Sequence, residues 1–145
     1  MTTLAPGEVA AEFSRATEAI EAATGRRPTL VRTGFGAIND AVLAEAGRQG
    51  LTAVNWDVVP FDWRNDANTA ATRAVLMSQI APNTVVLLHD TFASTVDLMS
   101  EFIPVLKANG YHLVTVSQML GPRAPGSLYG SRDNGPPVHD LVDVP

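Results

Sequence analysis

The chain has 145 residues, of which 46% are apolar, a formal net charge of −5 and no cysteine. This apolar content excludes a disordered chain, and the negative charge without a basic face argues against nucleic acid as a partner. The lack of cysteine excludes disulfides, thiolate catalysis and cysteine-bound zinc. No apolar stretch reaches the ~18 residues that a membrane span needs. Residues 1–20 lack the charged start and apolar centre of a signal peptide, and the compartment stays open.

Helical and strand patterns alternate along the chain. The first helix follows Pro6, has apolar residues such as Val9 and Phe13 at helical spacing, and stops at Gly25. Asn39 is expected to cap the second helix. The patterns predict four helices within residues 6–24, 39–50, 65–82 and 95–108, and four strands at 29–31, 51–56, 84–88 and 111–116.

This alternation favours an α/β fold, with about four strands paired in parallel through helical crossovers. The continuous apolar run at 84–88 is typical of a strand that is covered on both faces. Residues 1–120 are expected to form one domain. From residue 121 the chain is rich in proline and glycine, so residues 121–145 are expected to be a flexible appendage.

Polar and aromatic residues follow three of the expected strands. His89 closes the run at 84–88, Asp62 and Trp63 follow the strand at 51–56, and Arg32 follows the strand at 29–31. In parallel β/α folds this edge of the sheet binds ligands and carries catalytic side chains. A lone histidine beside an apolar strand is also compatible with a packing role.

The motifs and their order extend this interpretation. In chain order they are Thr24-Gly25, Pro28, Arg32-x-Gly34-Phe35-Gly36, Trp56, Asp62-Trp63, Leu87-Leu88-His89-Asp90 and Gly110-Tyr111. Together they resemble the polysaccharide deacetylases, the NodB-homology carbohydrate esterases of family 4, which remove N- or O-acetyl groups from glycans. The resemblance runs from about residue 4 to 120 and covers the C-terminal part of the family domain. It implies a distorted (β/α) barrel, here incomplete because the N-terminal strands are missing.

The resemblance also implies roles for individual residues. His89 matches the general acid, Asp62 the carboxylate that orients its imidazole, and Arg32 the arginine that pairs with the catalytic base. The residues that match substrate-binding positions are Leu87 for the acetyl methyl group, Trp63 for an aromatic wall and Phe35 for the groove lining.

The family's metal motifs have no counterpart in this sequence. The family holds a divalent metal, usually zinc, with one Asp of an Asp-Asp pair and two His of a His-[Ser/Thr]-x-x-His motif, and neither motif is present. The histidines at 89, 112 and 139 lack ligand spacing, and the last two are given no role. A zinc-type metal is therefore expected for the full family domain, with no metal site in this chain. Two further departures are Gly34 where proline is usual and Val59 where an aspartate is common.

Two functional hypotheses follow, and the expected partner is an acetylated polysaccharide. In the first, the chain is a shortened form of a deacetylase that acts on glycans such as peptidoglycan or chitin-like polymers, and is by itself inactive. In the second it is a truncated, noncatalytic paralogue that binds glycans or other partners. A third possibility is that another chain supplies the missing half. Missing strands would leave an exposed sheet edge, which predicts poor solubility or self-association.

Overall fold

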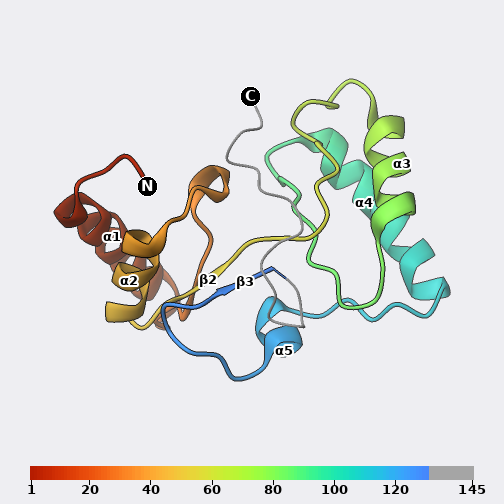
Figure 1. Ribbon diagram of the computed structural model, residues 1–145. Helices are drawn as coiled ribbons and strands as arrows, with labels where there is room; N and C mark the ends of the chain where they lie inside the picture. Colours follow the sequence, from red (N-terminus) through yellow and green to blue (C-terminus); the bar gives the residue numbers. More distant parts are fainter. Residues whose placement is uncertain (131–145) are drawn as a thin grey trace.

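The computed structural model describes residues 1–130 of the chain. They form an α/β fold with five α-helices, one 3₁₀ helix and a three-stranded sheet (Figure 1). In chain order the elements are α1 (Pro6–Thr24), β1 (Leu30–Val31), η1 (Gly34–Gly36), α2 (Asp40–Arg48), β2 (Thr52–Val54), α3 (Thr69–Gln79), α4 (Ala93–Ala108), α5 (Val116–Leu120) and β3 (Leu128–Tyr129).

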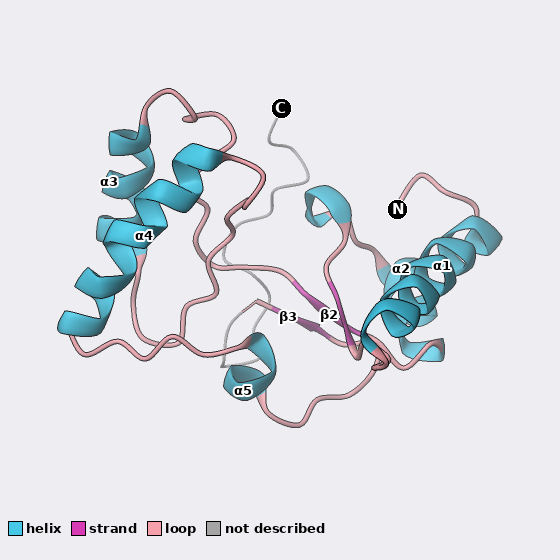
Figure 2. Cartoon of the chain, turned by 180° about the vertical axis from the view of Figure 1, so that it is seen from behind, coloured by secondary structure: helices cyan, strands magenta, loops and turns pink. Residues whose placement is uncertain are grey.

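The sheet is short and entirely parallel, with β2 between β1 and β3. Leu30 pairs with Thr52, and Ala53 pairs with Leu128. One pair of helices, α1 and α2, lies at one side of the sheet, and the pair α3 and α4 lies at the other (Figures 1 and 2). The chain that leaves β2 passes between the two helix pairs, and the candidate site is built there.

The expected helices are present, because their start and stop signals are local. Glu8 accepts a hydrogen bond from the backbone N–H of Ala5 at 2.8 Å, and α1 ends at Gly25, whose φ of 70° is the left-handed conformation that favours glycine. The predicted cap of α2 is confirmed, since the Asn39 side chain accepts from the Val42 N–H at 3.0 Å.

The run at 84–88 forms less of a strand than the sequence predicts. Its ladder is a single parallel bridge between Val58 and Val86, with Leu87 donating to the carbonyl of Val58 at 3.0 Å. The N–H of Val85 donates to the side chain of Asp57 instead of to a backbone carbonyl. A strand needs a continuous partner as well as an apolar sequence, and here the partner segment bends away into the loop that carries Asp62.

The predicted strand at 111–116 is wrong. Residues 111–115 are irregular, and the chain then enters α5. Thr115 caps this helix, accepting from the N–H of Gln118 at 3.2 Å, while the Gln118 side chain accepts from the Thr115 N–H at 3.0 Å. This reciprocal capping is a local helix signal that alternation of apolar residues does not report.

The structure also differs from the expected flexible appendage. Leu128 and Tyr129 form β3 and pair with β2, and the N–H of Gly126 donates to the carbonyl of Leu51 at 2.8 Å. Gly126 also packs against Gly47 of α2. The start of the proline- and glycine-rich segment is therefore part of the fold. Its remainder, including His139, lies outside the described residues.

Three clusters of buried side chains hold this arrangement together. The first joins α1, α2 and the start of β2 through Val9, Phe13 and Val42, and the second joins α3 and α4 through Leu76 and Phe102. The third lies beneath the candidate site and consists of Trp56, Val59 and Leu87, with partly buried Phe61, Trp63 and Val85 packed against it. Of the helices in residues 1–130, none has the length and apolar character to cross a membrane. The expected barrel and the expected self-association both remain predictions.

Candidate active site

The centre of the site is a pair formed by Asp62 and His89. The Nδ1 atom of His89 lies 3.0 Å from Oδ1 of Asp62, and the backbone N–H of His89 donates to Oδ2 at 2.7 Å. The Asp62 side chain is only 1% exposed, whereas that of His89 is 28% exposed. A carboxylate only accepts hydrogen bonds, so the proton of a neutral His89 imidazole is on Nδ1. Nε2 is then the nitrogen that is free to meet a substrate.

Local backbone structure places Asp62. Phe61 has a φ of 54°, an uncommon left-handed conformation for a bulky residue, and its carbonyl accepts from the N–H groups of Arg64 and Asn65 at 3.0 Å. The Asn65 side chain donates back to the carbonyl of Pro60. This tight turn directs the Asp62 carboxylate toward the end of the segment that carries His89.

A third donor completes the surroundings of Asp62. The hydroxyl of Thr95, in the first turn of α4, donates to Oδ2 of Asp62 at 3.0 Å, and Thr95 is itself buried. The buried carboxylate therefore accepts three hydrogen bonds from two parts of the chain. The sequence analysis missed Thr95, because a hydroxyl six residues after His89 carries no signal until α4 is placed against the loop at 61–65.

Aromatic rings surround the imidazole. Trp63 meets His89 in an edge-to-face arrangement with ring centroids 5.1 Å apart, and Phe92 does so on another side at 6.2 Å. Phe61 packs on Trp63, with centroids 5.5 Å apart. The structure thus places Trp63 against His89, together with Phe61 and Phe92, which the sequence analysis did not single out.

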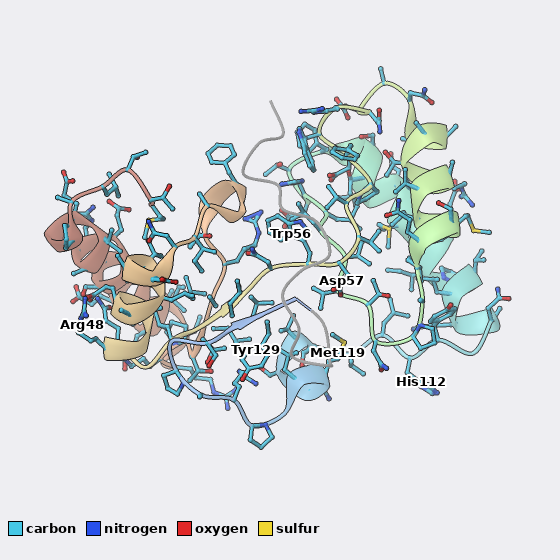
Figure 3. The ribbon with its side chains drawn as sticks, viewed as in Figure 1. Arg48, Trp56, Asp57, His112, Met119 and Tyr129 are labelled. Atoms are coloured by element: carbon cyan, nitrogen blue, oxygen red, sulfur yellow. The ribbon has the colours of Figure 1, made fainter. Side chains whose placement is uncertain are left out.

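Two other expected site residues, Leu87 and Arg32, lie against Trp56. Leu87 is buried in one cluster with Trp56, and the guanidinium of Arg32 lies over the Trp56 ring, 5.5 Å from its centroid. Figure 3 shows Trp56 and Asp57 where the chain leaves β2, between the two helix pairs. Arg32 therefore reaches the site through Trp56, and no described contact joins it to Asp62 or His89.

Phe35 is presented to solvent at the tip of η1. It is 89% exposed and has a φ of 59°. The next residue, Gly36, has a φ of 67°, and a Cβ there would lie 3.2 Å from the Trp56 ring. Glycine is thus required both by the backbone conformation and by the close approach of Trp56. The result is an exposed aromatic ring on a fixed turn, with no described ring contact to His89.

A groove of about 830 Å³ lies elsewhere on the molecule. It runs between the ends of α3 and α4 and the segment 109–119, and its lining includes Val86, Leu88, His112 and Leu113 but neither Asp62 nor His89. Its lining is largely apolar, and Figure 3 shows His112 near the C-terminal end of α4. The chemistry of His89 and Asp62 points to them, and not to this groove, as the candidate active site.

The described residues do not by themselves make a metal site. Among residues 1–130, no three His, Cys, Asp or Glu side chains gather where they could hold a metal ion. Structural and catalytic zinc sites use three or four such ligands.

Comparisons with known proteins identify the family of this chain. The family model for polysaccharide deacetylase matches residues 1–54. The peptidoglycan-N-acetylmuramic acid deacetylase PdaC of Bacillus subtilis (strain 168) is 34% identical over 119 residues, which are 82% of this chain and 25% of that protein. The chain belongs to the polysaccharide deacetylase family. It corresponds to part of the family domain and spans about a quarter of the length of this relative.

Solved structures of related enzymes share the fold. The family 4 carbohydrate esterase from Streptomyces lividans, in complex with acetate, superposes with a TM-score of 0.75 at 32% identity, over 86% of this chain and 65% of that one. A T48 deacetylase with substrate superposes with a TM-score of 0.80 at 28% identity, over 88% of this chain and 63% of the other. The motifs that suggested the family from sequence are thus accompanied by the family's fold.

Proposed function

We propose that this chain carries the acid-catalytic part of a glycan deacetylase, which hydrolyses acetyl groups of an acetylated polysaccharide. The observation that carries the proposal is the His89–Asp62 pair, in which a buried carboxylate faces Nδ1 of a partly exposed His89 side chain. The relatives act on peptidoglycan and on chitooligosaccharides by name, which favours an N-acetylated amino-sugar polymer as substrate.

The proposed chemistry is proton transfer to the leaving group. When an acetyl amide or ester is cleaved, the departing amine or alcohol needs a proton, and a protonated imidazole can donate it from Nε2. The Asp62 carboxylate on Nδ1 would stabilise the imidazolium and fix the orientation of the ring. A general acid of this kind contributes typically ~10²- to 10⁴-fold to the rate.

The surrounding residues are proposed to shape the substrate site. Trp63 is proposed as an aromatic wall beside the imidazole and Leu87 as the apolar contact of the acetyl methyl group. Phe35, exposed at the tip of η1, is proposed as a ring on which a sugar stacks. Arg32 is proposed to pair with a carboxylate base. The resemblance to the family 4 carbohydrate esterases implies a divalent, zinc-type metal in the full family domain, and His89 and Asp62 are proposed for proton transfer.

The test combines the chain itself with a chimeric enzyme. The isolated chain, incubated with acetylated chitooligosaccharide or peptidoglycan and Zn²⁺, is expected to release little or no acetate. In the chimera, this chain replaces the 119 aligned residues of the Bacillus subtilis deacetylase. The chimera is expected to release acetate, and His89→Ala in the chimera is expected to reduce kcat about 10²- to 10⁴-fold.

A matched control is available on the same chain. His112→Ala removes an imidazole that lines the separate groove and is expected to leave kcat of the chimera unchanged. A folded, active chimera in which His89→Ala has no effect would refute the acid role. If the isolated chain binds the glycan while no folded chimera releases acetate, the noncatalytic binding module becomes the better description.

A further inference from the structure

The first turn of α4 is attached to the loop that carries Asp62 through two neighbouring hydroxyl groups. Thr95 donates to Oδ2 of Asp62 at 3.0 Å, and Ser94 donates to Oδ1 of Asp66. Thr95 is buried, whereas Ser94 and Asp66 are at the surface. Of the two contacts, only that of Thr95 reaches the carboxylate that faces His89.

The Thr95 hydroxyl determines which way the carboxylate can turn. Oδ2 of Asp62 accepts from the backbone N–H of His89 and from Thr95, while Oδ1 accepts from Nδ1 of His89. With the N–H of His89 alone, the carboxylate could rotate about that bond and move Oδ1 off the imidazole. The second donor comes from a different element, and two donors on one oxygen hold the plane of the carboxylate.

We propose that Thr95 is a positioning residue for the imidazole of His89. By holding Oδ2 of Asp62, it keeps Oδ1 on Nδ1 and so keeps the neutral ring in the Nδ1–H form, with Nε2 free. The catalytic meaning of this arrangement rests on the proposed function. The effect of Thr95 on the imidazole is independent of the proposed function, because the position of the ring proton can be measured without an activity assay.

The experiment is long-range ¹H–¹⁵N NMR of the imidazole nitrogens in ¹⁵N-labelled protein, above the pH at which the ring is protonated. The His89 signals are assigned by their loss in His89→Ala. The parent protein is expected to show protonated Nδ1. Thr95→Val keeps the shape of the side chain and removes the donor, and it is expected to lower the ratio of Nδ1–H to Nε2–H about twofold to tenfold, the range that corresponds to the loss of one hydrogen bond.

Two variants separate positioning from packing. Thr95→Ser restores the hydroxyl and is expected to return the ratio to that of the parent. Ser94→Ala removes the neighbouring first-turn hydroxyl, which contacts Asp66, and is expected to leave the ratio unchanged. A purely structural role of Thr95 would change the stability in Thr95→Val without changing the position of the proton.

Several results would overturn the inference. One is a folded Thr95→Val protein with the parent ratio, and another is a Thr95→Ser protein that behaves like Thr95→Val. If Thr95→Val does not fold, the contact is tested in the parent protein. There the Thr95 hydroxyl proton is expected to exchange slowly and to show a nuclear Overhauser effect to the His89 backbone N–H. The absence of this nuclear Overhauser effect would refute the contact. The chimera assay of His89→Ala tests the proposed function separately.

Discussion

Replacing Asp62 by alanine would leave three hydrogen-bond donors without their acceptor: the backbone N–H and Nδ1–H of His89 and the hydroxyl of Thr95. A buried donor left unsatisfied costs about 1–3 kcal/mol. The His89 side chain is 28% exposed, so its Nδ1–H can instead donate to water. The donors left unsatisfied are then the backbone N–H of His89 and the hydroxyl of Thr95. Asp62→Ala is therefore expected to lower the free energy of unfolding by about 2–6 kcal/mol, a large part of the total of a domain of this size.

Asp62→Asn provides the informative comparison. Its amide oxygen can take the place of Oδ2 and keep the bonds from the His89 N–H and from Thr95. Its NH₂ group would then face Nδ1 of His89, which must accept, so the ring proton moves to Nε2. This variant is expected to lose only about 1–2 kcal/mol, because one hydrogen bond to a charged group is exchanged for a neutral one. It should nevertheless lose the acid function in the chimera, because a neutral amide does not stabilise the imidazolium as the carboxylate would.

The assay is urea unfolding at pH 7, followed by circular dichroism, with the slope of the free energy against urea compared between variants. Asp90→Ala is the matched control, because Asp90 is exposed and adjacent to His89, and its stability is expected within about 0.5 kcal/mol of the parent. The reasoning fails if Asp62→Ala is as stable as Asp90→Ala. It fails equally if Asp62→Asn and Asp62→Ala are indistinguishable in stability.

Two further predictions concern α2. Gly47→Ala should destabilise the protein by about 1–3 kcal/mol in urea unfolding, because the added Cβ would lie 3.1 Å from the backbone of Gly126, although alanine usually favours a helix. The pKa of Glu45 lies below its ordinary value, chiefly because Gln49 and then Arg48 donate hydrogen bonds to its carboxylate. The ionised Glu45 therefore stabilises the folded protein above its ordinary pKa of about 4.5, and this stabilisation is lost as the pH falls through the lower pKa of the folded protein. Glu45→Gln lacks this contribution at every pH. Its urea midpoint should therefore fall less than that of the parent between pH 5 and about 2.

Controls are at hand for both predictions. Gly7→Ala, in α1, has nothing within 4 Å of the added Cβ and is expected to be neutral or stabilising. A Gly47→Ala protein more stable than the parent would mean that Gly126 is not packed on α2. If Glu45→Gln and the parent lose stability in parallel on acidification, the hydrogen bonds to Glu45 do not carry the effect.

Much of the candidate site could be predicted from the sequence because its residues belong to short motifs. His89, Asp62 and Trp63 follow the ends of apolar segments, and the structure brings these three together. Arg32 and Phe35 were predicted for the same site, and they lie beside Trp56 and at the tip of η1 instead of on the imidazole. Which residues share a strand edge is visible in sequence, but which side chains touch depends on the turn at 61–65 and on the approach of α4.

The sequence by itself determined the four longer helices, α1 to α4, since apolar spacing, the Asn39 cap and the stop at Gly25 act within a few residues. Only the tertiary structure decided which segments form strands and that Thr95 contacts Asp62. Strand pairing joins distant segments, so residues 111–115 are irregular although the sequence predicted a strand there, while Leu128 and Tyr129 join the sheet. Thr95 likewise meets Asp62 across 33 residues of chain. The Thr95 hydroxyl acts in the site only because it faces a buried carboxylate. Tertiary packing, and not a local sequence pattern, brings the two groups together.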